Sequence, residues 1–133
     1  MEINIKNIMR SILKNRINRR GKRVGYWEEY YGNGNLFSRG SYKEGNKEGI
    51  WEYYWNNGNI ESRGSYVDGE LEGIWEFYWN NGNLYLRGSY KNGEMDGIWE
   101  IYYENGNLSR RCSYKEGNKE GIWESYHSNG NIL

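Results

Sequence analysis

The chain has no proline, one cysteine, one histidine and two phenylalanines among its 133 residues. The single cysteine, Cys112, excludes an internal disulfide and leaves no cysteine cluster for a metal. No apolar run of about 18 residues is present, so the sequence contains no candidate transmembrane helix. The first residues also lack the apolar stretch of ~7–15 residues that a secretory signal peptide needs. We therefore expect a cytoplasmic location.

What the chain has in abundance is aromatic rings and glycine. It contains 7 tryptophans, 14 tyrosines and 19 glycines. This combination favours strands and tight turns. Aromatic side chains bury a large area each, which argues against disorder even though few other apolar residues are present. We expect a thin core made mainly of rings.

The formal net charge of zero hides an uneven distribution of charge. Residues 1–26 carry eight basic side chains and one acidic side chain, a net charge of +7, whereas residues 27–133 carry 10 basic and 17 acidic side chains, a net charge of −7. A basic segment joined to an acidic body favours self-association or an anionic partner for the basic segment.

The sequence repeats every 24 residues. The clearest markers are Trp27, Trp51, Trp75, Trp99 and Trp123. Such a period is typical of stacked supersecondary units that bury surface against their neighbours. In residues 49–72, two short strand-like runs flank Asn57-Gly58, and Asn-Gly is the preferred centre of a type I′ hairpin turn. Each repeat is therefore predicted to be a β-hairpin.

The predicted turn sets which residues face each other. With Asn57-Gly58 at its centre, Glu52 faces Arg63, and the same rule pairs residues 28 with 39, 76 with 87 and 100 with 111. Each pair joins a glutamate to an arginine, which favours this register by about 0.2–1 kcal/mol per pair.

The same register places Trp51 opposite Gly64. An indole can lie across the bare backbone of a facing glycine, which explains a glycine inside a strand. In the copy that contains Trp99, the facing residue is Cys112, so we expect Trp99 to pack differently from the other tryptophans.

Strand alternation then assigns two faces to the sheet. The first carries Trp51, Tyr53, Trp55, Ile60, Ser62, Gly64 and Tyr66, and the second carries Ile50, Glu52, Tyr54, Glu61, Arg63 and Ser65. A glycine-bracketed loop at residues 68–73 is expected to join consecutive hairpins. The predicted fold is all-β: an antiparallel β-meander of ~24-residue hairpin repeats in a single twisted sheet.

The N-terminal segment does not follow the repeat. Apolar residues at helical spacing predict a short basic amphipathic helix over residues 3–15. We expect an N-terminal segment at residues 1–18 and about four and a half hairpin copies at residues 19–133. The helix is interpreted either as a cap on the sheet or as an anion-binding or membrane-surface arm. The basic residues of this arm are Lys6, Arg10, Lys14, Arg16, Arg19 and Arg20.

The repeated unit Gly-Ile-Trp-Glu-x-Tyr-x-x-Asn-Gly-Asn-Leu, followed by Arg-Gly-Ser-Tyr, resembles the MORN-repeat variant over roughly residues 19–133. The resemblance is to the version found in bacterial proteins that include antitoxins of toxin–antitoxin systems. It implies an antiparallel β-meander and a binding role without catalysis. Some members of that family are membrane-associated, and others neutralise a protein toxin or act as scaffolds.

The residues that chemistry would need are scarce. His127 replaces an aromatic residue of the other copies, and Cys112 has no histidine near it in sequence to activate it. The glutamates recur opposite arginines, which favours structural pairs over a general acid–base pair. We therefore predict no catalytic residue, no metal site, no cofactor and no enzyme activity.

The predicted function is to bind and inhibit another protein. An acidic, tyrosine-rich sheet suits a partner with a basic nucleic-acid-binding cleft, such as a toxin or a defence nuclease. The expected partner-binding residues occupy positions that vary between copies: Tyr53, Trp55, Glu61, Phe77, Trp79, Tyr85, Ile101 and Tyr103.

Three alternatives remain open at the level of sequence. The basic helix favours a membrane-surface or scaffold protein. Direct nucleic-acid binding is disfavoured by the acidic body, which repels phosphate. Exposed edge strands favour a homo-oligomer. Frequent Asn, Ile, Lys and Tyr suit an AT-rich genome, so the expected cytoplasm is that of a bacterium or, for a phage protein, of its host cell.

Overall fold

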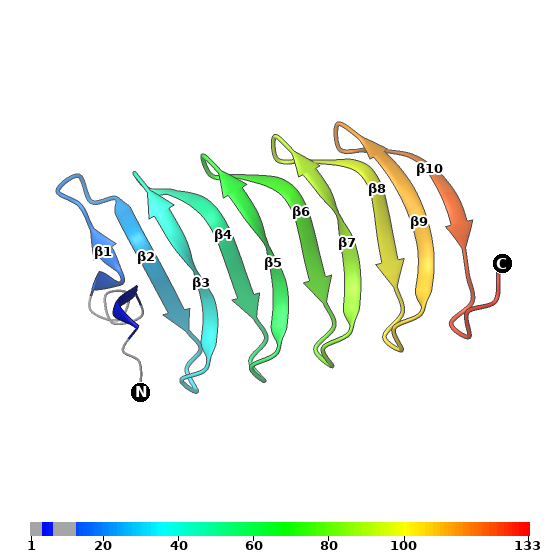
Figure 1. The fold of residues 1–133 in the computed structure, drawn as a ribbon, viewed down its shortest axis with the longest axis horizontal. Helices are drawn as coiled ribbons and strands as arrows, with labels where there is room; N and C mark the ends of the chain where they lie inside the picture. The colour runs from blue at the N-terminus through cyan, green and yellow to red at the C-terminus, as the bar shows by residue number, and fades with distance from the viewer. Residues whose placement is uncertain (1–3, 7–12) are drawn as a thin grey trace.

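The computed structural model describes residues 4–6 and 13–133, which form one sheet of ten strands (Figure 1). The strands are β1 (Arg16–Ile17), β2 (Arg23–Tyr30), β3 (Leu36–Lys43), β4 (Asn46–Tyr54), β5 (Ile60–Val67), β6 (Glu70–Tyr78), β7 (Leu84–Lys91), β8 (Glu94–Tyr102), β9 (Leu108–Lys115) and β10 (Asn118–Ser125). They lie side by side in chain order, so the predicted all-β, single-sheet antiparallel meander is confirmed.

The predicted N-terminal helix is not seen as an element of the described chain. Residues 1–3 and 7–12 lie outside the described part, so most of the predicted span of residues 3–15 falls there; within the described part of that span, only Ile5, Lys6 and Leu13 are helical. The end of the predicted N-terminal segment joins the sheet, because β1 pairs with β2. Lys14 also contacts the sheet, where its Nζ donates a hydrogen bond to the Tyr30 hydroxyl at 3.2 Å.

The Asn-Gly turns differ from the prediction. The Gly58 amide donates to the Trp55 carbonyl at 3.0 Å, and the Trp55 amide donates to the Asn59 carbonyl at 2.7 Å. Gly58 has a φ of 90°, whereas Asn57 is not among the residues with positive φ. This is a three-residue loop with a glycine bulge in place of a two-residue type I′ turn. Asn57 Oδ1 accepts the Asn59 amide at 2.9 Å, which closes the loop locally.

The type I′ turns lie on the opposite rim of the sheet. Asp68 and Gly69 have φ values of 51° and 85°, and Val67 pairs directly with Glu70. Because both central residues have positive φ, the turn needs only two residues. The predicted loop at residues 68–73 is therefore wrong beyond Gly69, since β6 already begins at Glu70.

The predicted backbone register is confirmed, but the indoles do not lie where the register suggested. Trp51 pairs with Gly64 in the ladder between β4 and β5. Its ring, however, lies over Gly40 of β3, where an added Cβ would sit 2.1 Å from the indole. The same relation joins two later tryptophans to the glycine 11 residues before them: Trp75 to Gly64 and Trp99 to Gly88.

This correction changes the expected effect of Cys112. Trp99 lies over Gly88 and is 0% exposed, so its ring is buried as those of Trp51 and Trp75 are. Its Nε1, however, has no hydrogen-bond partner among the described residues, whereas the Nε1 atoms of Trp51 and Trp75 donate to backbone carbonyls. The tryptophan 11 residues after Cys112 is Trp123, and it is 61% exposed. Trp99 therefore differs slightly, as predicted, and the larger change in packing is at Trp123, which the prediction did not name.

The core is a single layer of rings. Alternating indole and phenol rings meet edge to face in the order Trp27, Tyr42, Trp51, Tyr66, Trp75, Tyr90, Trp99 and Tyr114, with centroids 5.0–6.4 Å apart. Such contacts contribute about 0.5–1.5 kcal/mol each beyond the area they bury. We call this side of the sheet the tryptophan face.

The opposite side carries a ladder of glutamates and arginines. Glu52 pairs with Arg63 in the backbone register, as predicted. Its ion pair is nevertheless with Arg39 of the preceding strand, at 2.9 Å, while Arg63 binds Glu76 of the next repeat at 3.2 Å. Each acid therefore lies between two bases, and the charges join neighbouring repeats as well as the two strands of one hairpin.

Candidate binding site

The three-residue loops change which side chains share the tryptophan face. Each loop produces a register shift, as between Tyr53 and Tyr54 in the ladder of β4 and β5. Glu61 falls at this register shift, and its side chain lies on the tryptophan face. Burial raises the pKa of the Tyr53 hydroxyl, and the nearby Glu61 carboxylate raises it further. The alternation rule placed Glu61 on the other face, and the bulge overturns that assignment.

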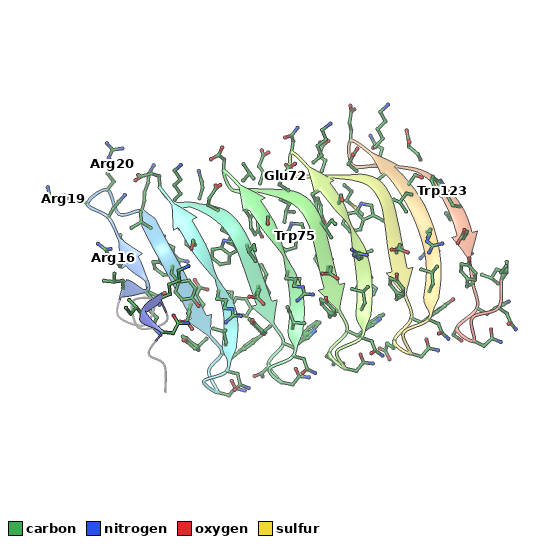
Figure 2. All side chains as sticks on the ribbon, in the orientation of Figure 1. Arg16, Arg19, Arg20, Glu72, Trp75 and Trp123 are labelled. Carbon is green, nitrogen blue, oxygen red and sulfur yellow. The ribbon has the colours of Figure 1, made fainter. Side chains whose placement is uncertain are left out.

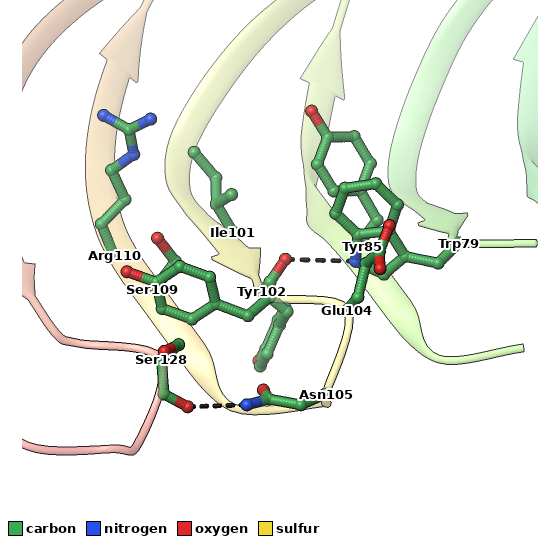
Figure 3. Close-up of a pocket in the computed structure, with 10 residues that line it drawn as sticks. Trp79, Tyr85, Ile101, Tyr102, Glu104, Asn105, Ser109, Arg110 and Ser128 are labelled. Carbon is green, nitrogen blue, oxygen red and sulfur yellow. Dashed lines mark hydrogen bonds between the residues drawn. The ribbon is translucent and has the colours of Figure 1, made fainter. Parts of the chain in front are cut away.

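Tyr85, at the position of Glu61 one repeat later, is also on this face. Its ring lies 4.5 Å from that of Trp79, with an interplanar angle of 57°. Trp79 is held by its Nε1, which donates to the Tyr102 carbonyl at 3.2 Å (Figure 3). The two rings therefore form a fixed aromatic wall.

Beside this wall the face is hollowed. The hollow has a volume of about 550 Å³, and its lining includes Trp79, Tyr85, Ile101, Tyr103, Ser109 and Arg110 (Figure 3). Ile101 stands where the preceding repeats have Phe77 and Tyr53, and Ser109 stands where they have Tyr85 and Glu61. Smaller side chains at two neighbouring positions leave this space open.

The hollow also contains charge. Among the described residues, the Arg110 guanidinium has no ion pair or side-chain hydrogen bond, and at the same position the earlier repeats carry Leu86, Ser62 and Ser38. Glu104, from the turn after β8, lines the hollow as well. The arrangement combines an aromatic wall, an aliphatic floor and an uncompensated cation.

A family model described as MORN repeat variant matches residues 23–44, 47–68, 71–92, 95–116 and 119–133. The chain belongs to the MORN repeat variant family. Each full match covers one hairpin of the sheet, from just inside one tight turn to the next. Comparison with curated proteins gives no match. MORN repeats generally bind proteins or membranes and are not typically catalytic, so we interpret the hollow as a binding site.

The MORN scaffold brings together some of the predicted partner-binding residues. Four of them line the hollow: Trp79, Tyr85, Ile101 and Tyr103. The other four belong to earlier repeats: Tyr53, Trp55, Glu61 and Phe77. Sequence reasoning missed Ser109 and Arg110, although both depart from the repeat pattern and a position-by-position comparison of the copies would have marked them.

Some predicted anchors have a structural task that the sequence did not reveal. Trp55 Nε1 donates to the Tyr78 carbonyl at 3.1 Å, and the Tyr103 hydroxyl donates to the Tyr126 carbonyl at 2.6 Å. Each bond reaches 23 residues along the chain, into the next MORN repeat. These side chains therefore hold consecutive repeats together while exposing part of their rings.

Tyr53 lies in a compact polar cluster. Lys47 Nζ donates to the Tyr53 hydroxyl at 2.5 Å, and the Tyr53 and Tyr66 hydroxyls are 3.1 Å apart. Burial and then the contact with Tyr53 raise the pKa of Tyr66, so its hydroxyl stays protonated well above neutral pH. Lys47 Nζ also lies 4.8 Å from the centre of the Trp51 ring. We interpret the cluster as a clamp on the ring layer.

Metal-binding and membrane-spanning features are not found in the described residues. Within residues 4–6 and 13–133, no group of three or more histidine, cysteine, aspartate or glutamate side chains is arranged to hold a metal ion. In the same part of the chain, no helix has the length and apolar character needed to cross a bilayer.

Proposed function

We propose that this MORN repeat protein is a non-enzymatic binding protein that blocks another protein, and that the partner docks on the tryptophan face at the hollow. The observation that carries the proposal is the contrast between constant and variable positions. The indoles and glycines that build the sheet recur in nearly every copy, whereas residues 85, 101, 109 and 110 differ from their counterparts. Side chains that are not needed to build the sheet can vary between copies, and we place partner recognition at these variable positions.

The rigidity of the wall supports this use. Interfaces gain most of their affinity from a few aromatic or arginine anchors in well-packed pockets. A ring that is already fixed loses little freedom when a partner arrives. Trp79 is fixed by its bond to the Tyr102 carbonyl and by its contact with Tyr85. A partner side chain that fills the hollow would meet surfaces that need no rearrangement.

We further propose that the partner is basic, as a toxin or defence nuclease with a nucleic-acid-binding cleft would be. Residues 27–133 carry a net charge of −7. Three acidic residues lie at and just after the tight turn between β5 and β6: Asp68, Glu70 and Glu72, the last of which is labelled in Figure 2. Such a field accelerates the approach of a basic protein and excludes nucleic acid from the same surface.

The test compares the native chain with a variant that alters the wall and keeps the sheet. Tyr85→Ser is suitable because serine occupies the equivalent position 109. Trp79→Ala is less suitable, since it also removes the bond to the next repeat. A partner captured by the native chain should be purified, and its complex should form at least tenfold more weakly with Tyr85→Ser. Its nucleic-acid-directed activity should fall when the native chain is added. Equal binding by both chains would refute docking on this face.

A second candidate function is supported by the N-terminal end of the sheet. Arg16, Arg19 and Arg20 gather around β1 and the turn that follows it (Figure 2). None of the three has an ion pair within the described ranges. This surface suits an anionic membrane, as in a scaffold protein. Vesicles with anionic lipid should bind the native chain and lose binding with Arg19→Ser/Arg20→Ser, whereas unchanged binding would exclude the role.

A further inference from the structure

The hollow is more specific than a general apolar patch, because its two ends differ in chemistry. One end is the aromatic wall of Trp79 and Tyr85, and the floor is Ile101. The Arg110 guanidinium lies at the other end, across Ile101 from the rings (Figure 3). A group that spans the hollow therefore contacts rings with one part and a cation with the other.

Arg110 differs from the other arginines of β2 to β9, which all form ion pairs. Arg23 binds Glu29 at 2.7 Å, and the arginines of the ladder face each bind a glutamate: Arg39, Arg63, Arg87 and Arg111. Arg110, an exposed residue of β9, has no acidic partner among the described residues. A planar guanidinium with free donors binds a carboxylate through two parallel hydrogen bonds.

The remaining lining groups orient such a ligand. Ser109 and Ser128 also line the hollow, and a serine hydroxyl can both donate and accept a hydrogen bond. Glu104 lines the hollow away from Arg110, toward the ring end (Figure 3). A carboxylate on the ligand is repelled at the Glu104 end and attracted at the Arg110 end, so one orientation is favoured.

We infer that the hollow receives a partner segment in which an apolar or aromatic side chain stands next to a carboxylate. The side chain lies on Ile101 against the Tyr85 ring, and the carboxylate binds Arg110. The inference rests on the proposed function, in that a protein partner docks on the tryptophan face, and it names the chemistry of the group that this partner inserts. It does not depend on the overall charge of the partner.

The simplest probes are three small compounds titrated into isotope-labelled protein and followed by NMR. N-acetyl-phenylalanine carries both the ring and the carboxylate, N-acetyl-phenylalaninamide lacks the charge, and N-acetyl-alanine lacks the ring. We expect N-acetyl-phenylalanine to shift the signals of Ile101 and of the Trp79 indole. The other two should bind about tenfold more weakly, because each lacks one of the two contacts. Equal affinity for the acid and the amide, or no shift at the highest soluble concentration, would overturn the inference.

Two variants taken from the chain's own repeats locate the contacts. Ser109→Tyr places the side chain of position 85 in the hollow, so all three probes should lose binding. Arg110→Leu copies position 86. This variant should bind N-acetyl-phenylalanine no more tightly than N-acetyl-phenylalaninamide, and its affinity for N-acetyl-phenylalaninamide should equal that of the native chain. Arg87→Gln on the opposite face is the matched control and should change neither. If Arg110→Leu retains the preference for the acid, the assignment of the carboxylate to Arg110 is wrong.

The two proposals fail in different ways. If a purified partner depends on Tyr85 while the probes show no preference for the carboxylate, docking on this face stands and the inferred ligand chemistry is rejected. If the probes behave as expected and no partner depends on Tyr85, the hollow binds the inferred group and the proposed protein-blocking function is rejected.

Discussion

Cys112 occupies the strand position on which the indole of Trp123 would otherwise lie. At the equivalent glycine of the preceding repeat, Gly88, an added Cβ would lie 2.1 Å from the ring of Trp99. Non-bonded carbon atoms do not approach this closely, so a residue with a Cβ expels the indole. The backbone pairing differs as well, because Cys112 pairs with Ile122 and Ser113 with Gly121, whereas Gly88 is passed over in the ladder of β7 and β8 and Ser89 pairs with Asp96.

Restoring glycine should restore the packing. In the variant Cys112→Gly, the ring of Trp123 is expected to fold onto β9 and become buried, as Trp99 is. Burial of the indole should stabilise the protein by about 1–2 kcal/mol after the entropic cost of glycine is deducted. Urea unfolding measures the gain, and a blue shift of tryptophan emission reports the burial. An unchanged emission maximum would show that the cysteine does not hold the ring out.

The reciprocal change should destabilise the sheet. Gly88→Ala forces the indole of Trp99 away from β7, and overpacking of this kind costs about 1–3 kcal/mol. Gly121→Ala is the matched control, since no atom lies within 4 Å of a Cβ there and Gly121 does not have a positive φ. It should change the free energy of unfolding by less than about 0.5 kcal/mol. Equal effects of the two substitutions would contradict the packing of indole on glycine.

The asparagines of the turns should stabilise the stacking of repeats. The side-chain amides of Asn57 and Asn59 both donate to the Asn80 carbonyl at 2.9 Å, and the pattern recurs at the next turns. Asn59→Ala removes one such bond and should cost about 0.5–1.5 kcal/mol. In Asn131, the side-chain amide has no hydrogen bond within the described part of the chain, so Asn131→Ala should be nearly neutral. Thermal unfolding of the two variants compares them directly.

Stability should fall at alkaline pH through Tyr66. Burial is the main cause that raises the pKa of this hydroxyl in the folded protein. An unfolded tyrosine loses its proton near pH 10, while the folded protein retains it, so the full stabilisation is present below about pH 10 and is lost as the pH rises further. Urea midpoints measured from neutral pH upward should decline above that value. Tyr66→Phe should show a shallower decline, and an identical slope would refute the assignment.

Much of the backbone could be predicted from local features. The Asn-Gly centre correctly paired Trp51 with Gly64, even though the loop has three residues and a bulge instead of two residues. The error did not propagate because β5 has one unpaired residue, Glu61, between Ile60 and Ser62, which restores the predicted register for the residues beyond it. Glu61 was misplaced because it is itself the residue at this register shift.

The candidate site was predicted only in part. Variation between copies identified Tyr85 and Ile101, and both line the hollow. Ser109 and Arg110 were overlooked because small or charged residues do not stand out as anchors in a search for aromatic rings. The hollow is defined by side chains that are too small to fill it, and such a space becomes visible only when the neighbouring strands are in place.

By itself, the sequence determined the period, the strands and the partner of each residue across its Asn-Gly loop, because these depend on backbone preferences within one repeat. The tertiary structure decided which glycine each indole covers and where a cavity remains. Those outcomes depend on how neighbouring strands pair across the tight turn. The register shift between β3 and β4 accompanies the packing of Trp51 over Gly40. At the last tight turn the residue in the glycine position is Cys112, and the ring of Trp123 stays exposed.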